Sequence, residues 1–420
     1  MPDEIVVKKP LPGSPAPVTL PGSTVLLFAI ACGLSVANVY YAQPLLDALA
    51  RDFGFSAATI GIVITMTQAG CALALLLLVP LGDLLERRRL MLVQLVLLIV
   101  ALLATATAST SFWLLTGMLA LGLLGTAMTQ GLIACAASAA GSAERGRVVG
   151  AAQGGVVIGL LLARTLAGTV AEVAGWRMVY LVSAALAVLL LTALWRLLPQ
   201  QLPTASRLSY RALLQSMLSL LTQQRVLQIR GVIALLMFAA FSIFWSAMVL
   251  PLSAPPFVLS HAQIGAFGLV GVIGALGAAR AGKRADQGYG QQTTGIAWLL
   301  LLAAWLPLAL MAHTMWALVL GIVLLDLAGQ AIHVTNQSMI FSGDSQSHSR
   351  LVACYMLFYA VGSGIGAIAA TSVYAFAGWY GVCLLGALVS LTGLLFWAWS
   401  LRYMPASAAA ASPDDMCGQR

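Results

Sequence analysis

Long apolar runs alternate with short polar segments along nearly the whole chain. Twelve runs cover residues 23–43, 57–80, 90–108, 112–139, 148–172, 178–198, 231–252, 262–281, 293–312, 316–341, 352–374 and 380–402. An α-helix needs about twenty apolar residues to cross the hydrocarbon core of a bilayer. The pattern therefore predicts an all-α integral membrane protein with twelve transmembrane helices, six in each half of the chain.

The two halves repeat one another. A segment that reads RVVGAAQGGVVIGLLLARTLAGTVAEVAGW recurs in outline as RLVACYMLFYAVGSGIGAIAATSVYAFAGW, and both copies begin with Arg and end with Ala-Gly-Trp. Three pairs of matching residues are each separated by 203 positions. They are Arg147 and Arg350 (350 − 147 = 203), Trp176 and Trp379 (379 − 176 = 203), and Asp83 and Asp286 (286 − 83 = 203). A constant offset indicates an internal duplication with no net insertion between the landmarks. We therefore predict two pseudo-symmetric six-helix bundles.

The predicted boundaries follow from the apolar runs. They give a leader at 1–22, an N-terminal bundle at 23–198, a linker at 199–230, a C-terminal bundle at 231–402 and a tail at 403–420. The linker combines several arginines with a short amphipathic stretch, which is typical of a helix that lies on a membrane surface. The leader is charged and proline-rich before any apolar run, so we expect no cleaved signal peptide.

Composition agrees with a membrane protein. The chain is 61% hydrophobic and 8% charged, whereas soluble domains carry about 25% charged residues. A net charge of +8 alone would allow a nucleic-acid partner, but the basic residues form short clusters after every second apolar run, the pattern of cytoplasmic loops. We therefore predict no nucleic-acid partner and a cytoplasmic location for both termini. The six cysteines show no metal-ligand spacing, so no metal and no cofactor are expected.

Two motifs and the overall organisation resemble the major facilitator superfamily of secondary transporters. After the second run, Leu81, Gly82, Asp83, Arg87 and Arg88 match the family's loop motif, and the eighth run is followed by Gly282 and Asp286. In the fifth run, Gly150, Gly159 and Gly168 match the spacing of the drug and proton antiporter signature, although Ala163, Arg164 and Ala167 replace its other Gly, Pro and Gly.

A further stretch, Asn38 to Pro44, together with Asn336 and Gln337, is similar to one subgroup of bacterial exporters. The resemblance implies two bundles around a central cavity, alternating access, a small-molecule substrate and a monomer in the bacterial inner membrane.

Asp326 is the one acidic residue deep inside an apolar run. Gln330, His333 and Gln337 follow it at i+4, i+7 and i+11, so the four polar side chains share one helix face. A charge at the bilayer centre costs about 2.5–3.5 kcal/mol on insertion scales, so this stripe is expected to face a wet cavity or a partner.

Arg164 is the predicted partner of Asp326, at nearly the same depth in the other half. Together with His333, the two form the predicted proton-coupling group. When Arg164 lies close to Asp326, its positive charge would keep the carboxylate ionised. When the two residues are separated in an apolar site, Asp326 would favour proton uptake. The alternatives are a static ion pair that fixes helix packing and, for His333, a neutral imidazole that caps a polar helix contact.

Two further groups are predicted to serve movement between the halves. An inter-helix gate on the cytoplasmic side is predicted at Asp83, Arg87, Arg88 and Asp286, although the arginines alone are also explained as topology charges. Close helix approach at a moving interface is predicted at Gly150, Gly159, Gly168, Gly362 and Gly366. Static packing explains these glycines nearly as well.

The resemblance also assigns spans to the cavity. The polar and aromatic residues predicted to line it are Asn38, Tyr41, Gln43, Gln130, Trp245, Gln330, Gln337, Tyr355 and Tyr359. Aromatic and amide side chains suit amphiphilic organic molecules better than small ions.

Competing functions find weaker support in the sequence. The best match to a nucleotide loop is Gly277-x4-Gly282-Lys283, but Arg284 stands where Ser or Thr would bind magnesium. A hydrolase would use His333 and Ser338, which are poorly aligned on their helix, and no G-x-S-x-G is present. We therefore predict a transporter, not an enzyme, that exports a small amphiphilic compound in exchange for protons. Import of a sugar or organic acid with protons, or a non-transporting sensor, remain the alternatives.

Overall fold

The computed structural model describes residues 20–141, 144–197, 209–341 and 348–404. Every regular element in these ranges is helical. The first half contains α1 (Gly22–Tyr40), η1 (Gln43–Leu45), α2 (Leu46–Phe53), α3 (Ile62–Leu73), η2 (Ala74–Leu78), η3 (Val79–Asp83), α4 (Arg87–Ala106), α5 (Ser111–Ala139), α6 (Arg145–Ala174) and α7 (Trp176–Leu197). The connecting helix is α8 (Tyr210–Gln223). The second half contains α9 (Arg225–Ala247), α10 (Val249–Ser253), α11 (His261–Arg284), η4 (Ala285–Tyr289), α12 (Gly290–Ala309), η5 (Leu310–Ala312), α13 (Met315–Phe341) and α14 (His348–Ser400).

Ten helical segments within the described ranges are long and apolar enough to cross a membrane. This is two fewer than the twelve predicted. One of the ten, Arg350–Ser400, is a double-length segment that changes direction at Gly378. The other difference is α11, which has 24 residues in all but is counted only through its first part, His261–Gly274, as a shorter apolar helix. The predicted all-α membrane architecture is confirmed.

Ala-Gly-Trp marks the same chain reversal in both halves. Gly175 ends α6 with φ 82° and ψ 163°, and Gly378 breaks α14 with φ 60° and ψ −160°. Backbone with positive φ and ψ near 180° is essentially restricted to glycine. The following tryptophans fix the turn, because Trp176 donates to Asp52 Oδ2 at 2.8 Å and Trp379 donates to the Leu308 carbonyl at 2.8 Å. The sequence repeat is therefore also a structural repeat.

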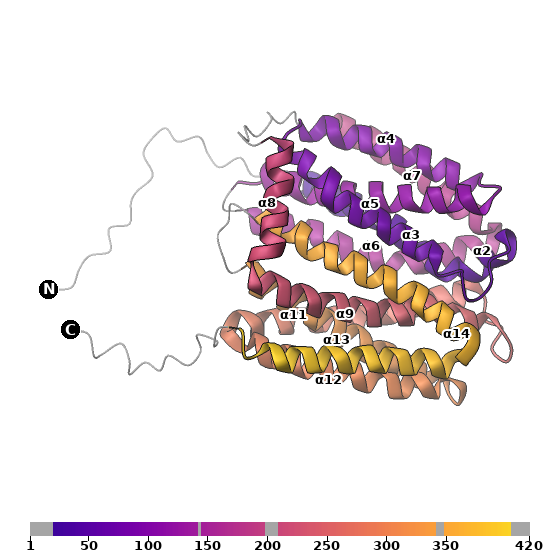
Figure 1. The fold of residues 1–420 in the computed structure, drawn as a ribbon. Coiled ribbons are helices and arrows are strands. Elements are labelled where there is room, and N and C mark those ends of the chain that lie inside the picture. Colours follow the sequence, from indigo (N-terminus) through magenta and orange to yellow (C-terminus); the bar gives the residue numbers. More distant parts are fainter. Residues whose placement is uncertain (1–19, 142–143, 198–208, 342–347, 405–420) are drawn as a thin grey trace, which may run out of the picture.

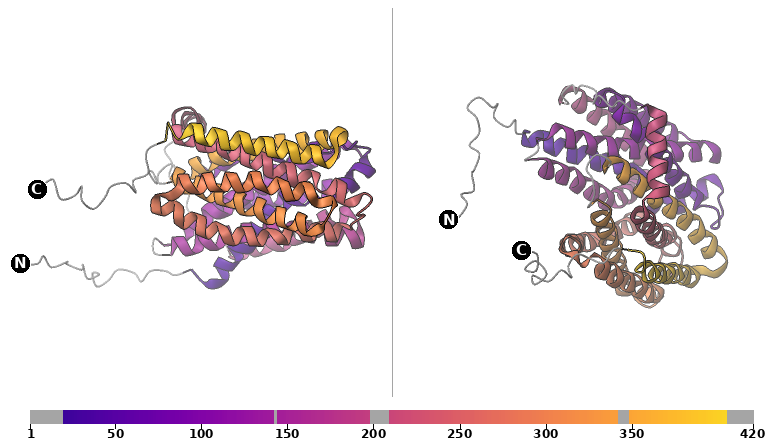
Figure 2. Two further views of the ribbon diagram at one scale, coloured as in Figure 1. Left: turned by 90° about the horizontal axis from the view of Figure 1, so that it is seen from below. Right: turned by 60° about the vertical axis from the view of Figure 1, so that its left-hand side comes forward.

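The long helices of both halves run along one common direction, and α8 crosses their ends (Figure 1). Two further views show the two halves side by side (Figure 2). Ser209 precedes helix α8 and caps it, because its hydroxyl accepts a hydrogen bond from the Ala212 amide at 3.3 Å. The helix buries Leu213 and Met217. The predicted amphipathic stretch of the linker is thus a helix. Residues 1–19, 198–208 and 405–420, which hold most of the predicted leader, linker start and tail, lie outside the described residues.

Small residues allow the halves to touch. A Cβ on Gly168 of α6 would lie 2.1 Å from the His261 carbonyl oxygen of α11, and one on Gly265 of α11 would lie 2.4 Å from the Arg164 carbonyl oxygen. The predicted glycines Gly159, Gly362 and Gly366 instead pack helices within a single half, and a Cβ on Gly150 would meet nothing within 4 Å. Of the five predicted interface glycines, the structure places Gly168 between the halves.

Candidate functional site

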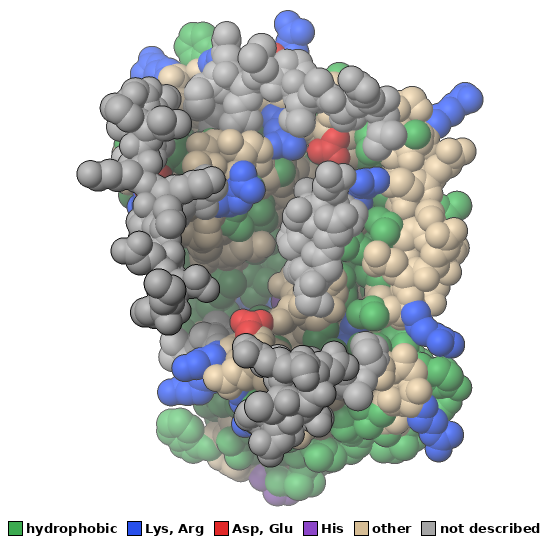
Figure 3. Space-filling model, turned by 90° about the vertical axis from the view of Figure 1, so that its left-hand side faces the viewer, with side chains coloured by type: hydrophobic (Ala, Val, Ile, Leu, Met, Phe, Trp, Pro, Cys, Tyr) green, Lys and Arg blue, Asp and Glu red, His purple; other side chains and the backbone are tan. Residues whose placement is uncertain are grey.

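A cavity of about 180 Å³ lies between the two halves. Its walls come from α1, α3, α5 and α6 on one side and from α9, α11, α13 and α14 on the other. Seven of the predicted site residues line it: Gln43, Gln130, Arg164, Asp326, Gln330, His333 and Tyr359. Figure 3 looks onto the end of the molecule that carries α8 and shows a hollow between the side chains on this face.

Arg164 is buried in the cavity wall, where three side chains contact its guanidinium group. The side chain is only 2% exposed, and its Nε donates to Gln43 Oε1 at 2.7 Å. The guanidinium carbon lies 4.0 Å from the ring centroid of Trp245 and 5.3 Å from that of Tyr40. Two aromatic rings and one amide therefore orient the charge, since a guanidinium is attracted to aromatic faces. Its Nη2 is buried and has no hydrogen-bond partner among the described residues.

Asp326 faces the same cavity from α13. Asp326 is 4% exposed, and its Oδ1 atom is buried without a hydrogen-bond partner in the described part of the chain. No ion pair joins it to Arg164 among the contacts of the described residues. The two predicted partners thus share one cavity from opposite halves without touching.

Helix α11 supports both charged groups through glycines. A Cβ on Gly268 would lie 3.2 Å from Arg164 Cβ, and a Cβ on Gly271 would lie 2.4 Å from Asp326 Oδ2. Three residues of helix correspond to a rise of about 4.5 Å. The aliphatic part of Arg164 and the carboxylate of Asp326 therefore contact α11 at points about one turn apart.

The polar stripe of α13 lies only partly in the cavity. Asp326, Gln330 and His333 line it, whereas Gln337 does not. His333 Nδ1 lies 2.9 Å from the Tyr355 hydroxyl, and its ring packs edge-on against Phe238 with centroids 5.3 Å apart. Tyr355 is completely buried and stands behind His333, outside the lining.

The remaining predicted lining residues lie elsewhere. Asn38 points into the first half, where Ser183 of α7 donates to its Oδ1 at 2.9 Å. Tyr41 is buried but does not line the cavity. Trp245 lies in a small adjoining pocket with Gln43 and Arg164, and its contribution is the ring beneath the guanidinium.

Sequence reasoning missed several polar lining residues, among them Tyr40 and Gln153. Both carry a signal in their spacing. Tyr40 is three residues before Gln43, and Gln153 is eleven residues before Arg164, so each shares a helix face with a predicted lining residue. Tyr40 has the larger structural role, because its hydroxyl lies 2.5 Å from that of Tyr359 in the other half.

The halves are joined at the end opposite to α8. His261 Nε2 lies 3.0 Å from Asp47 Oδ1, and the Ala262 amide donates to Glu172 Oε2 at 3.3 Å. On the other side of the cavity, the hydroxyls of Thr371 and Ser372 donate to the Ala58 carbonyl at 3.4 and 3.2 Å. These bonds connect the first half to the second and close this end.

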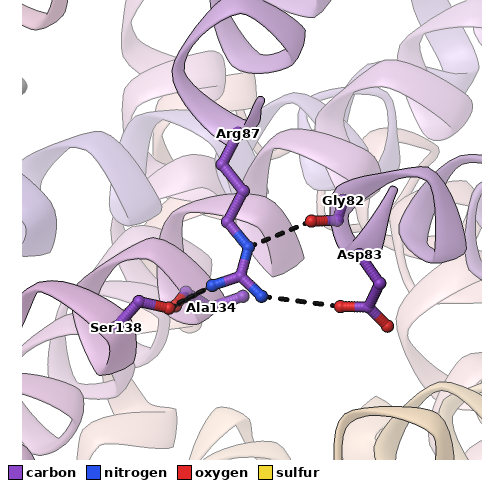
Figure 4. Close-up of polar contacts among 5 residues, drawn as sticks. All are labelled: Gly82, Asp83, Arg87, Ala134 and Ser138. Atoms are coloured by element: carbon purple, nitrogen blue, oxygen red, sulfur yellow. Dashed lines mark hydrogen bonds and ion pairs between the residues drawn. The ribbon is translucent and has the colours of Figure 1, made fainter. Parts of the chain in front are cut away.

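The predicted gate residues make their contacts within a half. Arg87 donates to the carbonyls of Gly82 at 3.1 Å and Ala134 at 3.3 Å and to the Ser138 hydroxyl, and it pairs with Asp83 at 3.5 Å (Figure 4). This ties η3 and the start of α4 to the end of α5.

The other two gate residues extend this pattern. Arg88 donates to the Trp195 carbonyl of α7 at 2.6 Å. In the second half, the Ser338 hydroxyl donates to Asp286 Oδ1 at 2.7 Å. Each gate residue therefore connects neighbouring helices of its own bundle.

Known proteins resemble this chain over most of its length. Residues 27–343 match the sequence model of the Major Facilitator Superfamily. YgaY of Escherichia coli K12, which is named as an uncharacterized transporter, is 42% identical over 380 residues that cover 89% of this chain and 94% of YgaY. SCO4007 of Streptomyces coelicolor, named as a probable transporter, is 30% identical over 359 residues that cover 85% of this chain and 83% of SCO4007.

A solved structure shares the fold. It is that of a bacterial homologue of the human lysosomal transporter Spinster in an inward-facing and unoccupied conformation. The TM-score is 0.71 at 13% sequence identity, with 90% of this chain and 97% of the other covered.

Proposed function

Because this chain belongs to the major facilitator superfamily and is a multi-pass membrane transporter, we propose that it exports a small amphiphilic organic compound in exchange for protons. Export takes place by alternating access, in which the cavity opens to one side of the membrane at a time. The observation that carries the proposal is the buried carboxylate of Asp326 in the cavity between the halves, whose Oδ1 has no hydrogen-bond partner among the described residues.

Asp326 is suited to carry the coupling proton. Burying an ionised carboxylate whose charge is not compensated costs free energy. Binding a proton or a cationic group removes this cost. Arg164 faces it from the other half, so movement of the halves changes the electrostatic attraction between them. His333, seven residues along the same helix face, extends the polar path toward the open end of the cavity.

The same cavity fits an amphiphilic substrate. Amides at Gln43, Gln130 and Gln330 alternate with the rings of Phe238 and Phe241 and with aliphatic side chains. Ligand sites of this kind combine a mostly apolar lining with a few polar groups that fix orientation.

The closed end, with the bond between Asp47 and His261, is inferred to face the outside. Basic side chains gather at the other end, around the hollow in Figure 3. Such an excess of Lys and Arg marks the cytoplasmic side. The structure then corresponds to an inward-facing state in the bacterial inner membrane, with both described ends of the chain on the cytoplasmic side.

The gate residues Asp83, Arg87, Arg88 and Asp286 are inferred to hold each bundle together at this cytoplasmic end. A transporter that rocks two halves against one another needs each half to move as one body. The contacts of Arg87 and Arg88 with α5 and α7 serve that need.

Proton exchange by the purified protein tests the proposal. Candidate compounds are added to the native protein and to Asp326→Asn in weakly buffered detergent solution, and proton release is followed with a pH indicator. We expect compound-dependent proton release that Asp326→Asn abolishes. Proton uptake would indicate import with protons, and binding without any proton change would remove Asp326 as the coupling residue and favour a sensor.

A further inference from the structure

We propose that the cavity selects zwitterions, meaning molecules that carry a carboxylate and an ammonium group at one end of an apolar body. This inference deepens the proposed export function and rests on the same cavity. It follows from how the two opposite charges in the cavity wall are arranged.

The charge content of the lining is small and balanced. Among the described lining residues, Arg164 and Asp326 carry the formal charges. The other titratable groups in the lining are His333 and the tyrosines Tyr40 and Tyr359. Each charged side chain has one buried polar atom without a partner, Nη2 of Arg164 and Oδ1 of Asp326. These two atoms are themselves buried, but both side chains line the cavity, so one positive and one negative group face a ligand there.

The two charges form no salt bridge with one another in the described part of the chain. Gln43, Trp245 and Tyr40 hold the guanidinium in place, and Asp326 is packed against Gly271 and Gly274 of α11. Since Arg164 and Asp326 line the same cavity, a ligand that carries both charges at one end can contact both groups.

A singly charged ligand satisfies only half of this site. An organic anion at Arg164 leaves the Asp326 carboxylate uncompensated unless Asp326 also takes up a proton, and an organic cation at Asp326 leaves the guanidinium with only its contacts to Gln43, Trp245 and Tyr40. Leaving one member of a buried charge pair uncompensated is strongly unfavourable. Opposite charges on one molecule compensate both groups, and Arg164 can hold a carboxylate through charge-assisted hydrogen bonds.

The rest of the cavity is built for an apolar body. Phe238 and Phe241 of α9 line the space together with Leu160 and Leu161 of α6. Phe238 is fixed edge-on against Tyr359, with centroids 4.5 Å apart. The ligand therefore carries an aromatic or branched aliphatic group beside its charged end.

The charge arrangement also explains competition with protons. When Asp326 takes up a proton, the carboxylate becomes neutral and no longer attracts the ammonium group. The zwitterion then keeps only its contact with Arg164 and dissociates more readily. One proton bound thus replaces one ammonium contact, which is the exchange that antiport requires.

Two matched sets of probes test the proposal on the native protein. One set shares a phenyl ring: phenylalanine, 3-phenylpropionate, 2-phenylethylamine and 3-phenylpropanol. The other shares a branched aliphatic chain: leucine, 4-methylpentanoate and 3-methylbutylamine. Binding is measured by calorimetry at one pH and salt concentration. We expect the zwitterion of at least one set to bind tenfold or more tightly than each relative that lacks one charge.

Variants assign each charge to its residue. Arg164→Gln should remove the preference for the zwitterion over the amine, and Asp326→Asn should remove the preference over the carboxylate. Arg147→Gln removes an exposed arginine outside the cavity and should leave both preferences unchanged. Because the ligand series on the native protein is decisive by itself, a variant that fails to fold does not prevent the test.

The outcomes separate this inference from the export function. Equal or tighter binding of a singly charged or neutral relative, or no binding by either zwitterion, overturns the zwitterion proposal. If such a relative also releases protons in an Asp326-dependent manner, the export function stands without it. If zwitterions bind selectively but release no protons, the substrate class stands and the proton coupling fails.

Discussion

The hydroxyl groups of Tyr40 and Tyr359 lie 2.5 Å apart, although the two residues come from opposite halves of the chain. Gln68 of α3 also donates to the Tyr359 hydroxyl, at 3.4 Å. Tyr40 packs under the Arg164 guanidinium, so the bond between the tyrosines is connected to the charged group of the cavity. In the proposed alternating access, separation of the halves at Tyr40 and Tyr359 breaks this bond.

Removing the Tyr359 hydroxyl is therefore expected to favour opening. Tyr359→Phe keeps the ring against Phe238 and deletes the bond between the halves. A hydrogen bond contributes about 0.5–1.5 kcal/mol, which corresponds to a two- to tenfold shift in the ratio of states. Spin labels on cysteines that replace Phe112 and Trp316, exposed residues at the closed end of each half, would report a larger share of long distances. Tyr380→Phe, at an exposed position, should change nothing, and an unchanged distribution in Tyr359→Phe would contradict the expectation.

The contact between Asp47 and His261 is expected to stabilise the same closed end. His261→Gln removes the charge and weakens a bond between α2 and α11. Since exposed and partly exposed ion pairs contribute about 0.2–1 kcal/mol, the ratio of states reported by the same labels should shift by about 1.4- to fivefold. Arg51→Gln is the matched control, because Arg51 also pairs with Asp47, at 3.0 Å, but from the same half and with a 66% exposed side chain. A larger effect of Arg51→Gln than of His261→Gln would rule out the role assigned to His261.

Two glycines of α11 are expected to respond differently to substitution. In Gly271→Ala the new methyl group meets the Asp326 carboxylate, so ligand binding should weaken at least tenfold while folding is largely preserved. In Gly274→Ala the methyl group meets the backbone of α13, 2.7 Å from the Asp326 carbonyl carbon, and stability should fall by about 1–3 kcal/mol. Gly154→Ala has open space and should alter neither. Calorimetry and thermal unfolding measure the two effects, and native-like binding in Gly271→Ala would show that the carboxylate position is not critical.

The sequence repeat predicted the fold well because its landmarks have strict physical requirements. Gly175 and Gly378 occupy backbone conformations that other residues avoid, so their positions survive as a readable pattern. The polar stripe on α13 could be recognised for a similar reason, because exposing the Asp326 carboxylate to lipid would cost too much free energy. These two features gave the duplication and three of the lining residues.

The choice of cavity face on α1 could not be read from the sequence. In a membrane protein apolar side chains cover both the lipid-facing surface and the interior, so hydrophobic periodicity does not separate them. Tyr40 and Tyr41 look equivalent in sequence, yet only Tyr40 lines the cavity. Asn38 satisfies its amide inside the first half through Ser183. Gln337 lies far enough along α13 to pass the end of the cavity.

Arg87 provides a test of whether the gate residues matter for movement as well as for packing. Arg87→Lys keeps the positive charge but loses the planar fork that now reaches Gly82, Ala134 and Ser138 together. Hydrogen bonds to charged groups contribute about 1.5–3 kcal/mol, so we expect the transport rate in proteoliposomes to fall about tenfold.

Ligand affinity in detergent should stay close to native in Arg87→Lys, because Arg87 does not line the cavity. Arg89→Lys makes the same exchange two residues further along α4 and should transport normally. If both variants transport at the same rate, the contacts of Arg87 serve neither the gate nor the rigidity of the bundle, and its charge acts only in setting the topology of the chain.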